Sequence, residues 1–270
     1  MISSFHAILL GALQGLTEFL PISSSGHLVL VPYIFNWNYQ GIAFDVALHA
    51  GTAIAIVLFF WQDWISIIRK ALFKNAKVTD QNVARYPDNL LWQIIVAAVP
   101  AGIIGMLIAK IVESTLHSVL LIAFNLVFFG LLLWYIDRKA KSDLKPQELT
   151  YGKSLLIGLS QSIALIPGVS RSGITLTACR WIGLEREEAA RFSFLLATPT
   201  IVGAFIIKLP SIIGESLGAS FWFGILASTI FGILAIKFLL NYLKKSDLSL
   251  FLWYRLVLAL LVVAFYIWRR

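Results

Sequence analysis

The sequence predicts an all-α integral membrane protein with six full spans and two re-entrant helical hairpins in an inverted-topology repeat. Three observations lead to this fold class. Hydrophobic residues make up 59% of the 270 residues and charged residues only 13%, whereas soluble domains average roughly 25% charged residues. Apolar segments are spread along the whole length, so we expect one integral membrane domain over residues 1–270. Finally, two pairs of these segments are interrupted by Ser, Gly and Pro.

A full helical span needs about 20 apolar residues. Six segments qualify: Gly41–Trp61, Leu90–Ile111, Val119–Ile136, Ala189–Lys208, Phe221–Leu243 and Leu248–Trp268. Four shorter segments form two pairs: Phe5–Leu20 with His27–Phe35, and Lys153–Ile166 with Ile174–Ile182. Irregular backbone at membrane depth is tolerated only where protein buries it or a watery cavity lies beside it. We therefore predict two re-entrant hairpins, with tips near Pro21–Gly26 and Pro167–Gly173.

A shift of 147 residues aligns the two hairpins. It pairs Gly11 with Gly158, Gln14 with Gln161, Ser23 with Ser170, Ser25 with Ser172 and Gly26 with Gly173, whereas Pro21 and Pro167 are out of step by one. Each half, about 1–148 and 149–270, holds one hairpin and then three spans. Because three crossings reverse direction, the second half enters the membrane from the opposite side. Sites in such repeats lie where interrupted helices meet.

Lysine and arginine predict the orientation. If neither hairpin crosses, the side of the two termini carries Lys110, Lys208, Arg269 and Arg270. The other side carries seventeen basic residues, from Arg69 to Arg255, and Arg171 lies in a tip. The positive-inside rule makes the richer side cytoplasmic, so we expect both termini and the first hairpin to face outward. The net charge of +8 then reflects cytoplasmic loops and anionic membrane lipids, not nucleic acid.

The second tip combines one cation with hydroxyls and glycines. Arg171 lies between Ser170 and Ser172, and Gly173 and Thr175 follow. The planar fork of arginine matches phosphate oxygens, and a helix that begins near Ser172 would direct free N–H groups into the tip. The pattern predicts a phosphate cradle. The alternative is that Arg171 reaches to the membrane surface or pairs with a structural carboxylate.

The first tip supplies acid–base groups. Glu18 suits a general base, a general acid or a ligand for a hard cation, and His27 suits proton transfer near neutral pH. The serines offer a nucleophile or hydrogen bonds, and with Gly26 they are assigned to the substrate site: Ser23, Ser24 and Ser25. The alternative for His27 is a buried histidine bonded to the backbone.

Asp45 and His49 are four residues apart near the outer end of the first span, so they share a helix face. They either line the entrance to the site or pair with each other. Together, the two tips place an acid, a histidine and hydroxyls opposite an arginine at mid-membrane. A phosphate-bearing lipid that reaches a hydrolytic site is the ligand that this arrangement predicts.

Two motifs resemble those of a known family: Glu18–His27 (EFLPISSSGH) and Pro167–Gly173 (PGVSRSG). They look like the signature motifs of the bacterial undecaprenyl-pyrophosphate phosphatases, also called bacitracin-resistance proteins. The resemblance extends to Phe44–His49 and Phe192–Leu196 and so covers most of the chain. It implies removal of the terminal phosphate of undecaprenyl pyrophosphate, which recycles the lipid carrier for cell-wall synthesis.

The resemblance also implies site roles. Glu18 and His27 match the catalytic acid and histidine, Ser24 a proposed nucleophile and Arg171 the diphosphate-binding arginine, with Ser170 and Thr175 as supporting polar positions. It implies a divalent cation, Mg²⁺ or Ca²⁺, bound partly by Glu18, and a multi-pass protein of the bacterial plasma membrane whose site faces the periplasm or the outside. A homodimer is left open.

One position departs from many family members, which have a glutamate where this chain has Gln14. The amide of Gln14 can ligate a metal or orient water, but it cannot act as a base. Two questions stay open at this point: whether Ser24 or a water molecule is the nucleophile, and whether the same tips serve a transporter of undecaprenyl phosphate. A phosphatase of the membrane acid-phosphatase type is disfavoured, because its further Lys…Arg-Pro and second-histidine motifs are absent from the sequence.

Overall fold

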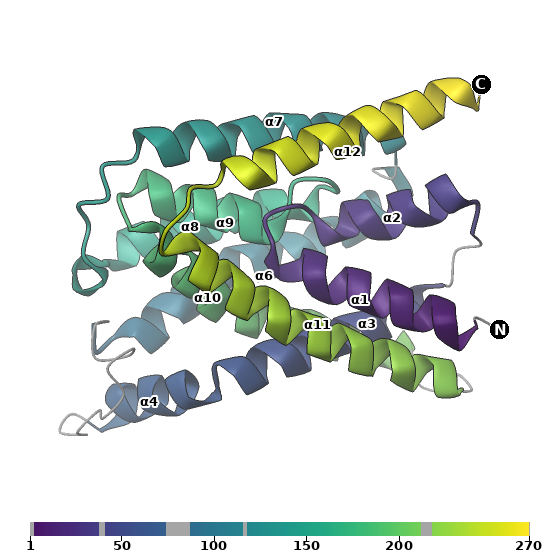
Figure 1. The fold of residues 1–270 in the computed structure, drawn as a ribbon. Helices are drawn as coiled ribbons and strands as arrows, with labels where there is room; N and C mark the ends of the chain where they lie inside the picture. The colour runs from purple at the N-terminus through teal and green to yellow at the C-terminus, as the bar shows by residue number, and fades with distance from the viewer. Residues whose placement is uncertain (1–2, 38–40, 74–86, 116–117, 212–217, 270) are drawn as a thin grey trace.

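The described part of the chain folds into α-helices joined by short turns and 3₁₀ segments. A computed structural model describes residues 3–37, 41–73, 87–115, 118–211 and 218–269 (Figure 1). The first half contains α1 (Ser4–Phe19), α2 (Ser24–Phe35), α3 (Ile42–Phe59), α4 (Trp61–Leu72), α6 (Leu90–Thr115) and α7 (Val119–Lys139). The first half ends with η1 (Pro146–Glu148). The second half contains α8 (Tyr151–Ser162), η2 (Ile163–Leu165), α9 (Arg171–Trp181), α10 (Arg186–Lys208), η3 (Leu209–Ser211), α11 (Ala219–Leu243) and α12 (Ser249–Trp268). Four basic residues that the orientation prediction counts lie outside the described residues: Lys74, Lys77, Arg85 and Arg270.

Five of the described helices are long and apolar enough to cross a membrane: α6, α7, α10, α11 and α12. A sixth crossing is formed if α3 and α4 are taken together, and these two helices bend by 65° at the break between them. The prediction of an all-helical membrane protein is therefore confirmed, with five or six candidate spans. The predicted span Gly41–Trp61 ends at the bend, and the sequence did not predict α4 as a helix of its own.

Charged residues explain why α3 does not continue straight into α4. Asp63 lies in the first turn of α4, whereas Arg69 and Lys70 lie in its last turn, an arrangement that suits the helix dipole. Asp63 also forms a buried ion pair with Arg191 of α10. The Arg191 guanidinium in turn lies 5.4 Å from the ring centre of Phe60, the residue at the break. The start of α4 is thus held at α10.

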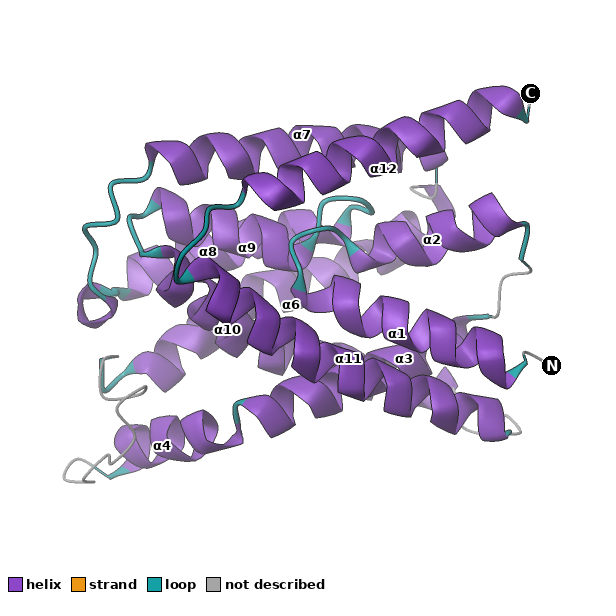
Figure 2. Cartoon of the chain, in the orientation of Figure 1, coloured by secondary structure: helices purple, strands orange, loops and turns teal. Residues whose placement is uncertain are grey.

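Two helical hairpins, α1–α2 and α8–α9, enter the molecule from opposite sides. In Figure 1 the first hairpin begins and ends on the side where both termini lie, and the second begins and ends on the other side. Their loops lie side by side in the interior (Figure 2), where the Ser172 hydroxyl donates to the Leu20 carbonyl oxygen at 2.9 Å. These loops lie at the predicted tips, Pro21–Gly26 and Pro167–Gly173.

Both returning helices begin three residues before their apolar segments. They start at Ser24 and Arg171, ahead of His27 and Ile174, so α9 begins one residue before the predicted start near Ser172. The apolar pattern begins only after the polar first turn, so hydrophobicity alone places the helix starts too late. The consequence is functional, because Ser24 and Arg171 become the first residues of two helices.

Serine caps set these helix starts in both hairpins. The Ser23 hydroxyl accepts a hydrogen bond from the Gly26 N–H at 3.3 Å, and the Ser170 hydroxyl accepts one from the Gly173 N–H at 3.1 Å, as N-cap residues do. The two caps are 147 residues apart and have φ angles of 74° and 75°. The two tips therefore share one local structure.

The most buried of the candidate spans is α10, which packs against α3, α6, α9 and α11. Glycines bring other helices into close contact, as is common inside membranes. Gly11 and Gly15 of α1 lie against the backbone of α11 at Gly224 and Ser228. Gly158 of α8 lies directly against the Ala97 carbonyl of α6. Each hairpin is thus packed backbone to backbone against a long helix.

We predict that Gly158→Ala lowers the thermal unfolding temperature in detergent by several degrees. A Cβ atom at this position would overlap the Ala97 backbone, and overpacking of this kind costs about 1–3 kcal/mol. The matched control is Gly152→Ala on the same helix, where an added Cβ meets nothing within 4 Å. This control should leave the unfolding temperature unchanged or raise it, since alanine favours helix. Equal effects of the two substitutions would contradict the packing of α8 on α6.

Candidate active site

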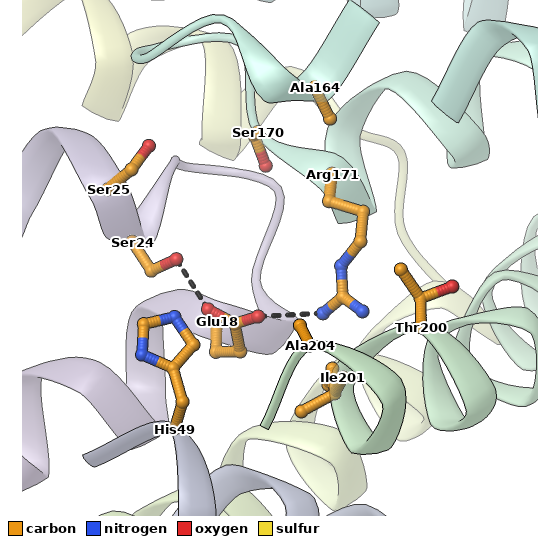
Figure 3. Close-up of a pocket in the computed structure, with 10 residues that line it drawn as sticks. All are labelled: Glu18, Ser24, Ser25, His49, Ala164, Ser170, Arg171, Thr200, Ile201 and Ala204. Atoms are coloured by element: carbon orange, nitrogen blue, oxygen red, sulfur yellow. Dashed lines mark hydrogen bonds and ion pairs between the residues drawn. The ribbon is translucent and has the colours of Figure 1, made fainter. Parts of the chain in front are cut away.

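A cavity of about 210 Å³ opens where the two tips meet α3 and α10 (Figure 3). The first half of the chain contributes Glu18, Ser24, Ser25 and His49 to its wall. The second half contributes Ser170 and Arg171 from the tip and Thr200, Ile201 and Ala204 from α10. The cavity is therefore polar where the hairpin tips line it and partly apolar along α10.

Glu18 is the centre of the hydrogen-bond network in this cavity. Its Oε1 atom lies 2.7 Å from Nη2 of Arg171, which forms a buried ion pair between the two hairpins. Its Oε2 atom accepts hydrogen bonds from the Ser24 hydroxyl at 2.5 Å and from the Gln14 amide at 3.0 Å. Arg171 also donates from Nη1 to the Ala197 carbonyl oxygen at 3.2 Å. The structure thus brings together four predicted site residues: Gln14, Glu18, Ser24 and Arg171.

Two helix N-termini meet at the cavity. Ser24 is the first residue of α2 and Arg171 is the first residue of α9, and both line the wall. The N-terminus of a helix carries partial positive charge and unpaired N–H groups, both of which favour an anion. With the Arg171 guanidinium between them, the two termini direct positive charge and N–H donors toward the cavity.

The remaining predicted tip residues build the loops that hold this site. Ser23 and Ser170 are the caps, and only Ser170 also lines the cavity. Both serines have a positive φ, a backbone conformation that is strained for a residue with a side chain. Thr175 bonds to the Arg171 carbonyl at 2.8 Å and to the Ser193 hydroxyl at 2.5 Å. Strained backbone of this kind clusters at functional sites.

Gly26 and Gly173 lie against their own caps and do not line the cavity. An added Cβ at Gly26 would lie 3.3 Å from the Ser23 hydroxyl oxygen, and one at Gly173 would lie 2.5 Å from Nη2 of Arg255. The absence of a side chain at these positions therefore lets the caps and Arg255 approach the backbone.

His27 lies beside the first tip but is not among the residues that line the cavity. Its Nδ1 atom is 2.7 Å from the Ser23 carbonyl oxygen, and its Nε2 atom is 2.7 Å from the hydroxyl of Tyr254 in α12. A carbonyl oxygen only accepts, so the Nδ1 atom carries the proton and the Nε2 atom accepts one from Tyr254. The predicted role of His27 in proton transfer stays a prediction.

His49 lines the cavity, whereas Asp45 does not. The two residues are linked through the backbone: Nδ1 of His49 is 2.8 Å from the Asp45 carbonyl oxygen. Figure 3 shows the His49 ring beside Glu18 and Ser24, on the opposite side of the carboxylate from Arg171. Of the two predicted entrance residues, the structure brings His49 to the site.

Arg255 of α12 contacts both tips, and sequence reasoning missed this role. The orientation prediction counts it among the cytoplasmic basic residues, and this is a correction: its side chain is fully buried between the two tips. Nε donates to the Pro21 carbonyl oxygen at 2.6 Å, and Nη2 donates to the Val169 carbonyl oxygen at 3.3 Å. The available signal was a single arginine inside the apolar segment Leu248–Trp268, since charges within a span usually have a function.

The residues near Glu18 fit a divalent cation that takes some of its ligands from the protein and the others from a substrate. The described residues contain no cluster of three or more His, Cys, Asp or Glu side chains, so a complete protein cage is not present among them. Gln14, however, has a buried Oε1 atom without a hydrogen-bond partner in the described part of the chain. Mg²⁺ and Ca²⁺ take oxygen ligands, and Mg²⁺ is commonly bound by one or two carboxylates plus phosphates and water.

The fold and the cavity define a helical membrane protein with a polar cavity between two hairpin tips. The chain belongs to the family described as Bacitracin resistance protein BacA, whose sequence profile matches residues 7–261. It is 46% identical over 259 residues to the undecaprenyl-diphosphatase of Pelotomaculum thermopropionicum, which covers 96% of this chain and 95% of that protein. It is 45% identical over 266 residues to the undecaprenyl-diphosphatase of Moorella thermoacetica, with 98% of each chain covered.

We predict that Arg255→Met lowers the thermal unfolding temperature in detergent by several degrees. Methionine fills a similar volume but cannot donate, so the Pro21 and Val169 carbonyl oxygens lose a buried donor at a cost of about 1–3 kcal/mol each. The control is Arg269→Met at the C-cap of the same helix, where an exposed side chain contacts Ile34 and little change is expected. If Arg255→Met unfolded at the wild-type temperature, the hydrogen bonds of Arg255 would not be what holds the two tips together.

Proposed function

We propose that this protein is an undecaprenyl-diphosphatase, which hydrolyses undecaprenyl pyrophosphate to undecaprenyl phosphate and inorganic phosphate. The observation that carries the proposal is the ion pair of Glu18 with Arg171 beside Ser24, in a cavity that residues of both hairpins line. Full-length relatives that bear this enzyme name support it. The reaction recycles the lipid carrier for cell-wall synthesis and thereby confers resistance to bacitracin.

The diphosphate group binds at Arg171 and the first turn of α9. The guanidinium fork and the N–H groups of the Ser170–Gly173 turn supply charge and donors for phosphate oxygens. Ser25 and Ser170 offer hydroxyls in the same wall. The prenyl tail lies in the surrounding lipid, since the exposed surface of the spans is largely apolar.

The attacking oxygen comes from Ser24 or from a water molecule. Ser24 donates to Glu18 at 2.5 Å, so Glu18 is in place to take its proton as the oxygen forms a bond to the terminal phosphorus. The bond from that phosphorus to the bridging oxygen breaks, and the lipid phosphate leaves with the electron pair. Water then releases the phosphate from the serine. If water attacks first, Glu18 and Ser24 orient it. Trapping of a phosphoserine would favour the serine route.

A divalent cation, Mg²⁺ or Ca²⁺, is part of the proposal. Glu18 and the Oε1 atom of Gln14 would hold it together with the diphosphate, and the cation would supply neutralising charge for the phosphate oxygens. Because Gln14 is neutral, this site has one carboxylate where many family members have two. The chain's own contribution to charge neutralisation rests more heavily on Arg171.

The two hairpins are proposed to be re-entrant, and the halves 1–148 and 149–270 to form an inverted-topology repeat. The equal caps at Ser23 and Ser170 and the entry of the hairpins from opposite sides support this reading. The excess of basic residues on the side opposite the termini supports a location in the bacterial plasma membrane with both termini outside. The first hairpin would then open the site toward the periplasm or the outside.

We predict that the purified protein in detergent releases phosphate from undecaprenyl pyrophosphate, and that Arg171→Ala lowers kcat/KM by about 10²–10³-fold. One electrostatic donor at the reacting group is typically worth this factor. Arg171→Lys keeps the charge but loses the planar fork, so it should give an intermediate rate. Phosphate release is measured directly, without a second compartment.

Near-normal rates in Arg171→Ala would contradict the assigned cradle. A wild-type protein that binds undecaprenyl phosphate but never hydrolyses the diphosphate would instead favour the alternative function, transport of the lipid phosphate. The broken helices and opposed hairpins are compatible with that alternative.

We predict that EDTA abolishes phosphate release, and that Gln14→Glu lowers the Mg²⁺ or Ca²⁺ concentration needed for half-maximal activity. A second carboxylate beside Glu18 adds charge and an oxygen ligand for a hard cation. Gln14→Ala is the matched control, and it should raise the required concentration because the amide oxygen is lost. Activity that is insensitive to EDTA in all three proteins would rule out the cation site.

A further inference from the structure

His27 and His49 have the same local arrangement but different surroundings. In each case Nδ1 lies close to the carbonyl oxygen of the residue four positions earlier, Ser23 at 2.7 Å and Asp45 at 2.8 Å. A carbonyl oxygen only accepts, so the neutral form of each ring carries its proton on Nδ1. The lone pair available for proton transfer is therefore on Nε2 in both residues.

The two Nε2 atoms differ in what they face. Nε2 of His27 is 2.7 Å from the Tyr254 hydroxyl, and His27 does not line the cavity. His49 does line the cavity, and among the described residues no hydrogen bond occupies its Nε2 atom. Figure 3 shows its ring directed toward the space that Glu18 and Ser24 share.

The other base in the cavity is already engaged. Glu18 uses Oε1 for Arg171 and Oε2 for Ser24 and Gln14. Hydrolysis of a diphosphate consumes one water molecule by either the direct or the serine route, and that water must lose a proton to a base. Glu18 is placed to take the proton of Ser24, and three of its roughly four lone-pair sites are occupied, so a second base is better placed to serve the water.

We propose that His49 is a catalytic residue that accepts the proton of the hydrolytic water. This inference rests on the proposed function and adds a residue role to it. As the water oxygen forms its bond to phosphorus, one water proton moves to Nε2 of His49. The bond from phosphorus to the leaving oxygen breaks, and that oxygen keeps the electron pair. The leaving oxygen is the bridging oxygen in direct attack and the Ser24 oxygen in the serine route, and it then receives the proton from His49.

The test compares asparagine and alanine variants of both histidines with undecaprenyl pyrophosphate as substrate. Asparagine retains a donor for the backbone carbonyl that Nδ1 contacts but has no basic nitrogen. His49→Asn should lower kcat by about 10²–10⁴-fold, the usual value of general acid–base catalysis, with a much smaller change in KM. His49→Ala should recover about tenfold in rate with added imidazole, because a free base replaces a held one only in part.

His27→Ala is the matched control and should not respond to imidazole, because its Nε2 atom is bound to Tyr254 outside the cavity. His6→Ala, at a half-buried residue that bonds to Ser3 and does not line the cavity, should have wild-type activity. Thermal unfolding of each variant confirms that it is folded.

Three results would overturn the inference: wild-type kcat in His49→Asn, loss of activity in His49→Ala without imidazole rescue, or rescue of His27→Ala instead. A wild-type protein that releases no phosphate would overturn the proposed function itself, which is a separate outcome.

Discussion

The ion pair between Glu18 and Arg171 is the interaction on which the site depends. It joins two hairpins 153 residues apart in sequence, at 2.7 Å, with both side chains largely buried. Neither charge would be stable alone in this position, because desolvation of an unpaired ion costs several kcal/mol. Each hairpin therefore supplies the counter-charge that the other requires, and the pair explains why the two tips meet inside the molecule.

The surrounding contacts keep the tips in place when that pair is disturbed. Ser172 bonds to the first tip, and Arg255 binds one carbonyl oxygen in each tip. In the proposed reaction a diphosphate competes with Glu18 for Arg171, so the ion pair loosens as the substrate binds. Groups that are fixed in advance need no reorganisation at the moment of reaction, and this is what Ser172 and Arg255 contribute.

Much of the fold follows from the sequence. Hydropathy locates the spans to within a few residues, and Ser, Gly and Pro locate the two interruptions. The helices α2 and α9 start three residues before the apolar segments that hydropathy locates, because the caps Ser23 and Ser170 rely on hydrogen bonds that hydropathy does not report. The bend after α3 was missed for a similar reason: it depends on the contacts of Asp63 and Phe60 with Arg191, which is far away in the chain.

By itself, the sequence determined which chemical groups are available: a carboxylate and serines in one tip, an arginine in the other, and two histidines nearby. Only the tertiary structure decided which of them meet. Tyr254 of α12 binds His27, whereas His49 faces the cavity, and Arg255 holds the tips instead of lying in a loop. Spacing along one helix cannot reveal these contacts, because the partner of each side chain lies on a helix that packs against it from the other half of the chain.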